Sequence, residues 1–207
     1  MNILLVDTAT YIPGYSYWVN GKELFRRILK GEKNADMIIP GIVDDFKVHH
    51  CDLRQISHFS LANGPGSFTG LRVGSAIAKG ICLSTGADLV QVNSLDILAN
   101  SYSESKEGDI LIALIPSNSK TNEYYCGRYK VVNGDTVLES DYFISKPENL
   151  NRKNEETLIF QNDEDVCFDS QMRLTLRMIE ENKFTKITNS EPFYMKEFEP
   201  IKNKIIK

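Results

Sequence analysis

The chain has 207 residues, of which 42% are hydrophobic and 25% are charged, and its formal net charge is −4. This length and apolar content allow a buried core, in one large domain or two small lobes, and exclude a disordered protein. Because nucleic-acid affinity depends on clustered Lys and Arg that release counterions from phosphates, the acidic balance excludes general RNA affinity. Any RNA contact would have to be local or shared with a partner, and we expect tRNA contact to be at most indirect.

Cysteine spacing and the N-terminus indicate the compartment. The N-terminal MNILLVDTAT has no basic region before its apolar run, so it predicts a first strand and not a signal peptide. The longest other apolar run, Ile110–Ile115, is too short to cross a bilayer. We therefore expect a cytoplasmic protein without membrane association, whose thiols are reduced because none forms a C-x-x-C pair: Cys51, Cys82, Cys126 and Cys167.

In chain order, the first half predicts a strand, a hairpin, a helix and then a strand–loop–helix unit. The run Ile3–Val6 favours a strand buried on both faces, and Asn20-Gly21 joins the two strands of the hairpin. Apolar residues from Ala35 to Val48 recur at helical spacing with Pro40 inside the run, so we expect a helix that is kinked or restarts there. The other expected elements are a strand at 58–62, a glycine-rich loop, a helix at 71–83, a strand at 89–92 and a short helix at 94–100.

The pattern begins again in the second half. Strands are expected at 110–115, around 124–132 and 137–144, and at 158–161, with an amphipathic helix near 172–181 and a polar loop at 117–122. The polar stretch SYSESKEG at 101–108 predicts a boundary between two α/β lobes, residues 1–103 and 104–207.

The glycine-rich stretch NGPGSFTGLRVG, residues 63–74, raises the possibility of an anion site, because free N–H groups at a helix start attract negative charge. However, no Lys-Ser or Lys-Thr completes a P-loop, and Thr69 stands where a dinucleotide motif needs its third glycine. The alternative is structural. Gly64 and Gly66 would then make a tight turn, and Gly70, Gly74 and Ala78 would form a bare helix face for close backbone packing.

Asp7, at the end of the first strand, has two interpretations. It could hold a hydrated Mg²⁺ beside a nucleotide, because ligands gather at the carboxyl ends of strands in α/β sheets. It could also cap a turn with Thr8 and Thr10, since Asp is a common turn residue. The candidate nucleotide or anion loop, vestigial in this chain, consists of Asp7, Thr8, Thr10, Gly64, Gly66, Ser67 and Thr69.

Other catalytic patterns are missing from the sequence. The three histidines have no H-x-x-x-H or H-E-x-x-H spacing, so no metal set is predicted, and no G-x-S-x-G motif supports a serine hydrolase. The strand that opens the second lobe ends Ile115-Pro116-Ser117-Asn118 without a carboxylate, which argues against phosphoryl transfer. The basic C-terminal run, 202–207, is interpreted as a solvated tail, and the less favoured alternative is a contact with RNA.

Four segments together resemble the TsaB (YeaZ) family: NILLVDTAT at the start, NGPGSFTGLRVGSAIAKGI at 63–81, VNSLDILA at 92–99 and EPFYMKEF near the end. The resemblance is strong over about the first hundred residues and in the tail, and weak between Ser101 and Ser190. It implies a two-lobed α/β fold of the actin/sugar-kinase/Hsp70-like (ASKHA) kind. It also implies a cytoplasmic role in tRNA processing, namely threonylcarbamoyladenosine modification at position 37 of tRNAs that read codons beginning with A.

In this family the chain would be a non-catalytic scaffold without a cofactor. It would form a heterodimer with the catalytic paralogue TsaD, be joined by the ATPase TsaE, and form a homodimer when alone. The expected partner interface is Ile38, Ile39, Ile42, Val43, Phe46, Gly70, Val73, Gly74, Ile77, Ala78 and Ile81. On this view Ile42→Asp or Phe46→Asp abolishes pairing and leaves the fold intact.

This sequence departs from the family in two places. An I-D-A-R-like segment is replaced by Ile115-Pro116-Ser117-Asn118, and the family's His before the interface helix has no counterpart near residues 34–36. Two rival functions stay open: an ATP-dependent small-molecule kinase of the same superfamily, with Asp7 and the glycine loop around the phosphates, and a peptidase, for which no nucleophile or metal set is visible.

Overall fold

The computed structural model describes residues 1–10, 12–29, 34–118, 121–150, 156–161 and 167–196. Its first sheet has five strands in the order β3-β2-β1-β4-β5. The strands β1, β4 and β5 are parallel, β2 is antiparallel to β1, and β3 is antiparallel to β2. The strands are β1 (Asn2–Asp7), β2 (Gly14–Val19), β3 (Lys22–Ile28), β4 (His58–Ala62) and β5 (Asp88–Val92).

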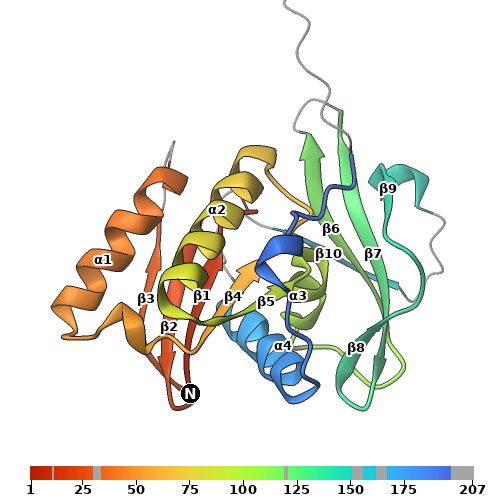
Figure 1. The fold of residues 1–207 in the computed structure, drawn as a ribbon. Coiled ribbons are helices and arrows are strands. Elements are labelled where there is room, and N and C mark those ends of the chain that lie inside the picture. Colours follow the sequence, from red (N-terminus) through yellow and green to blue (C-terminus); the bar gives the residue numbers. More distant parts are fainter. Residues whose placement is uncertain (11, 30–33, 119–120, 151–155, 162–166, 197–207) are drawn as a thin grey trace, which may run out of the picture.

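Successive side chains of β1 enter two different cores, because neighbouring residues of a strand point to opposite faces. Leu4 and Val6 join the core beneath α1 (Ile38–Val48) and α2 (Phe68–Thr85). Ile3 and Leu5 pack on the opposite face against α4 (Phe168–Glu180). Figure 1 shows α1 and α2 side by side along this first sheet.

The second sheet has the order β10-β6-β7-β8, and β9 pairs with β7. In it β10 is parallel to β6, and the other pairings are antiparallel. The strands are β6 (Ile110–Asn118), β7 (Glu123–Val132), β8 (Asp135–Leu138), β9 (Phe143–Ser145) and β10 (Glu156–Phe160). The helix α3 (Ser94–Asn100) packs against this sheet through Leu95, Leu98 and Ala99.

The two halves of the chain exchange helices. The helix α3 precedes the predicted boundary at 103/104 but packs on the second sheet, while α4 follows the second sheet and packs on the first. Inside that second contact, Gln171 donates to the Ser60 hydroxyl at 3.1 Å, and Ser60 and Thr175 share a hydrogen bond of 2.7 Å. The division into lobes at 103/104 therefore remains a prediction, because a helix from each half of the chain packs on the sheet of the other half.

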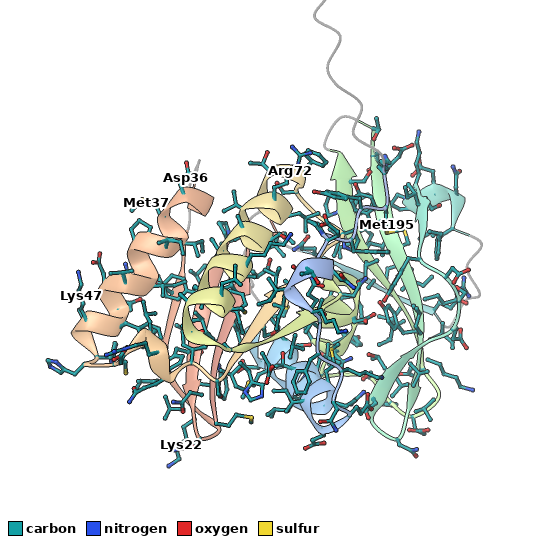
Figure 2. All side chains as sticks on the ribbon, viewed as in Figure 1. Lys22, Asp36, Met37, Lys47, Arg72 and Met195 are labelled. Atoms are coloured by element: carbon teal, nitrogen blue, oxygen red, sulfur yellow. The ribbon has the colours of Figure 1, made fainter. Side chains whose placement is uncertain are left out.

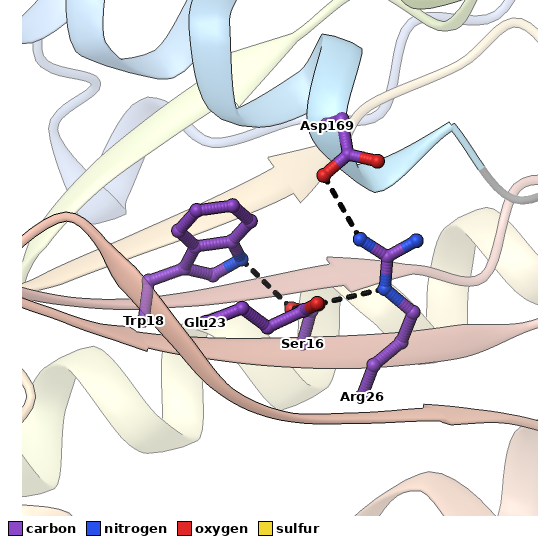
Figure 3. A network of polar contacts seen from close by, with 5 residues as sticks. All are labelled: Ser16, Trp18, Glu23, Arg26 and Asp169. Carbon is purple, nitrogen blue, oxygen red and sulfur yellow. Dashed lines mark hydrogen bonds and ion pairs between the residues drawn. The ribbon is translucent and has the colours of Figure 1, made fainter.

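A polar network holds the start of α4 on the hairpin (Figure 3). Arg26 of β3 donates to Glu23 at 2.6 Å and to Asp169 of α4 at 3.0 Å, with its guanidinium over the Phe168 ring. Ser16 in turn donates to Glu23 and accepts from the Trp18 indole at 2.8 Å. The network joins residues that are far apart in the sequence.

Several element predictions are corrected. The helix expected to be kinked or to restart at Pro40 is a 3₁₀ turn (Asn34–Met37) followed by α1 from Ile38, so the α-helix starts just before the proline, in whose first turn the missing N–H has no partner anyway. The strand expected at 137–144 is two short strands, β8 and β9. The helices expected at 71–83 and 172–181 start earlier, at Phe68 and Phe168.

The short 3₁₀ helices Leu53–Gln55, Pro147–Asn149 and Ile187–Asn189 complete the described secondary structure. Among the described helices, none is both long and apolar enough to span a membrane. The basic C-terminal run at 202–207, singled out in the sequence, lies outside the described residues.

Candidate functional site

The turn after β1 is organised by Asp7. One of its carboxylate oxygens, Oδ1, accepts the backbone N–H groups of Ala9 at 2.8 Å and Thr10 at 3.1 Å. The side chain is almost completely buried, and this burial raises its pKa to about 6, although the hydrogen bonds act in the opposite direction. Asp7 therefore performs the capping role considered for it, in a site that disfavours its charge.

The glycine loop lies against this same turn. A Cβ on Gly66 would be 2.2 Å from the Ala9 carbonyl oxygen, and a Cβ on Gly70 would be 1.8 Å from the Thr8 carbonyl oxygen. Thr8 also donates its hydroxyl to the Gly70 carbonyl at 2.7 Å. These positions are glycine because two backbones meet there, as the structural interpretation of the motif expects.

Several N–H groups of the loop already have partners within the chain. The Ser67 N–H donates to Ala9 O at 2.8 Å, the Gly64 N–H to the Ser94 hydroxyl at 3.1 Å, and the Gly70 N–H to the Ser67 hydroxyl at 3.3 Å. Ser67 is the N-cap of α2, whereas the exposed Thr69 lies inside the helix. An anion here would compete with these internal hydrogen bonds.

A pocket of about 350 Å³ opens beside Asp7, between the β1 turn, α3, the segment after α3 and the end of β10. Of the seven residues in the candidate loop, Asp7 and Thr10 line it, whereas Thr8, Gly64, Gly66, Ser67 and Thr69 do not. Among the described residues, the lining consists of Asp7, Thr10, Ser94, Ile97, Leu98, Ser101, Tyr102, Ser103, Glu104, Ile159, Phe160, Gln161 and Cys167.

Sequence reasoning missed Glu104 and Gln161 in this pocket. Glu104 lies in the polar stretch interpreted only as a boundary, and Gln161 directly follows β10. Neither position carries a recognisable motif. Only the folding of both sheets around α3 brings them to Asp7.

The predicted partner interface divides into buried and exposed residues. Ile38, Ile42 and Phe46 of α1 are 0–2% exposed and belong to the core. On α2, Gly70, Gly74, Ile77 and Ala78 are also buried; the two glycines contact Thr8, and Ile77 and Ala78 lie in the core with α1. Ile39 is 41% exposed, and Val43, Val73 and Ile81 are intermediate.

This burial corrects the mutational test drawn from the sequence. Ile42→Asp or Phe46→Asp would place a charge in the core, so neither variant would leave the fold intact. The same two helices expose large apolar side chains that sequence reasoning omitted: Met37 just before α1, Val48 at its end and Leu83 on α2, the last being 72% exposed. Figure 2 shows Met37 just before α1, Lys47 on α1 and Arg72 on α2.

Side chains for other chemistry are dispersed in the described part of the chain. No group of three His, Cys, Asp or Glu residues is arranged to hold a metal ion there. His49 stacks on Phe25 with ring centroids 4.9 Å apart, and His58 shares a hydrogen bond with Ser57. The four cysteines are free thiols.

Comparison with known proteins shows which family this chain belongs to. A family model described as TsaD, tRNA N6-adenosine threonylcarbamoyltransferase, matches residues 33–187. Curated relatives include the TsaB proteins of Escherichia coli, 28% identical over 72% of this chain, and Bacillus subtilis, 29% identical over 65%. The chain belongs to the family that this model describes, in its TsaB (YeaZ) branch.

The TsaB relatives are longer than this chain. It spans 64% of the E. coli protein and 57% of the B. subtilis protein, and both are described as tRNA threonylcarbamoyladenosine biosynthesis proteins. The structure of YeaZ from Pseudomonas aeruginosa superposes with a TM-score of 0.77 at 16% identity, covering 94% of this chain and 99% of that one. The predicted α/β fold is thereby confirmed, and it is the fold of the YeaZ structure.

The segments that carry the TsaB resemblance meet in the structure. The tail segment donates from the Phe193 N–H to Asn63 O at 2.9 Å, immediately before the glycine loop. Tyr194 packs on Phe68 of α2, with ring centroids 5.1 Å apart. The Arg72 guanidinium lies over the same Phe68 ring, 4.1 Å from its centroid. The tail and the glycine loop therefore form one local structure.

Proposed function

We propose that this chain is a non-catalytic subunit in the biosynthesis of tRNA threonylcarbamoyladenosine, and that it pairs with a TsaD-type catalytic paralogue. Its TsaB relatives carry the name of that pathway, which supports the proposal. A TsaE-type ATPase joins the pair, and tRNA is bound by the partner, in keeping with the acidic balance of this chain.

The observation that carries the proposal is the α1–α2 surface, which we define as Met37, Ile39, Val43, Val48, Val73 and Leu83. Four of these six, Met37, Ile39, Val48 and Leu83, are 41–72% exposed, although isolated exposed apolar residues are normal on protein surfaces. Here they follow two neighbouring helices (Figures 1 and 2). A set of this kind on adjacent elements is typical of a protein–protein interface.

The test compares single charged substitutions on this surface with one elsewhere. We expect Ile39→Asp or Leu83→Asp to weaken pairing with the TsaD-type paralogue by at least about tenfold, because each buries an unpaired charge in the complex. Val137→Asp, at a 49% exposed position on β8, is the matched control and should pair normally. Size-exclusion chromatography with light scattering measures the complex, and circular dichroism checks the fold.

Normal pairing by both surface variants would refute the interface while leaving the family assignment untouched. The same column run without the partner tests whether the free chain forms a homodimer through this surface, because a self-complementary helix face supports a two-fold dimer. Ile39→Asp should then convert the dimer to a monomer.

A further inference from the structure

The pocket beside Asp7 is rich in hydrogen-bond acceptors. Its described lining contains two carboxylates, Asp7 and Glu104, and neither Lys nor Arg. Two of its hydroxyls already donate within the chain: Thr10 to Ile12 O at 3.0 Å and Ser101 to Leu98 O at 2.7 Å. These hydroxyls therefore present mainly lone pairs to a ligand.

One acceptor in the lining has no partner among the described residues. The Gln161 Oε1 atom is buried and receives no hydrogen bond from them, a costly condition for a polar atom inside a protein. A ligand that donates a hydrogen bond would relieve it. A donor or a positive charge would also stabilise the carboxylate of Asp7. Burial is the largest cause of its raised pKa, and no basic group is among the interactions that lower that pKa.

Apolar side chains also line the pocket. Ile97 and Leu98 of α3 and Ile159 and Phe160 of β10 line the pocket between its polar residues. The volume of about 350 Å³ lies within the range of small-molecule sites. Glu104, on the segment after α3, is exposed, whereas Asp7 is almost completely buried.

We propose that this pocket binds a small aliphatic amine as its ammonium cation, with Asp7 as the counter-ion, Gln161 as a hydrogen-bond acceptor and the alkyl chain on the α3–β10 walls. The same acceptors repel phosphate, so the site discriminates against the nucleotide expected in the kinase alternative. Glu104 holds a second ammonium group in a diamine. This binding is independent of the partner interface, since the two sites share none of the residues that define them.

Isothermal titration calorimetry on the full chain tests the proposal with three four-carbon probes, n-butylamine, 1,4-diaminobutane and sodium butyrate, and with Mg-ATP. The two amines should bind, whereas butyrate, which has a similar alkyl chain and the opposite charge, and Mg-ATP should give no heat of binding. Saturable binding of butyrate or Mg-ATP, or no binding of either amine at millimolar concentration, would overturn the proposal.

Variants then locate the site. Asp7→Asn keeps the oxygen that caps the turn and removes the charge, so it should weaken n-butylamine binding by at least about tenfold. Gln161→Leu removes the unpartnered acceptor and should weaken it about threefold or more, while leaving the fold as stable as the wild type. It therefore tests the site even if Asp7→Asn folds poorly.

Glu104→Gln should remove the preference for the diamine over the monoamine, which we expect to be about twofold to fivefold because Glu104 is exposed. Glu139→Gln, an exposed position outside the pocket lining, is the charge-matched control and should change neither affinity. Unchanged amine affinity in both Asp7→Asn and Gln161→Leu would place the binding elsewhere and refute the site.

Discussion

At the scale of single residues, Asp7 stabilises a turn through hydrogen bonds although its burial disfavours its negative charge. Its carboxylate caps the β1 turn through two backbone N–H groups, yet it is 3% exposed and its charge is disfavoured. The capping role uses only an acceptor oxygen, which an amide also supplies. The negative charge is therefore not required by the turn.

The raised pKa of Asp7 predicts how the stability of the protein changes with pH. Burial raises the pKa of Asp7 from 3.8 to about 6, so the folded state is penalised when the carboxyl ionises, and stability falls as the pH rises from 3.8 towards 6. Above that range Asp7→Asn should be more stable than the wild type by ~3 kcal/mol, and below it the two should be equal.

Urea unfolding followed by circular dichroism, at a pH on each side of this range, measures the difference. Asp141→Asn, an exposed aspartate after β8, serves as the control and should leave both curves unchanged. A stability gap between Asp7→Asn and the wild type that does not depend on pH would contradict the assignment.

At the scale of elements, α2 has two kinds of glycine that the sequence alone does not distinguish. Gly70 lies against the Thr8 carbonyl oxygen, where an added Cβ would be only 1.8 Å away, whereas a Cβ on the exposed Gly80 would meet nothing within 4 Å. Both are within the same helix. Their substitution by alanine therefore has opposite consequences.

We expect Gly70→Ala to destabilise the protein by at least ~1–3 kcal/mol, because backbone must move to admit the methyl group. Gly80→Ala should stabilise it by up to ~1 kcal/mol, since alanine favours a helix interior. Chemical denaturation of the two variants side by side gives both values. A stabilising Gly70→Ala would mean that β1 and α2 do not approach as described.

At the scale of the whole molecule, the exchange of α3 and α4 makes each half depend on the other. The Asp96 carboxylate of α3 accepts from Tyr129 at 2.7 Å and from Tyr142 at 2.8 Å, both in the second half of the chain. In the other direction, Phe168 and Met172 of α4 cover Ile3 and Leu5. Each sheet thus has part of its core supplied by the other half.

This arrangement predicts a single cooperative unfolding transition. Trp18 is the one tryptophan and lies on the first sheet, so its fluorescence reports that sheet, while far-ultraviolet circular dichroism reports both. The two probes should give the same midpoint in urea. Separate midpoints would show that the halves are independent lobes after all.

The strand–loop–helix unit around the glycine loop and the TsaB resemblance could be predicted from the amino-acid sequence, because they depend on local periodicity and on glycines that the local backbone geometry requires. The sequence could not decide which apolar residues of α1 are core: Ile39 and Ile42 are the same residue type, and only the position of the sheet buries one and exposes the other. The pocket lay equally beyond prediction. Asp7, Glu104 and Gln161 are far apart in the chain, and their meeting depends on long-range packing that no local pattern records.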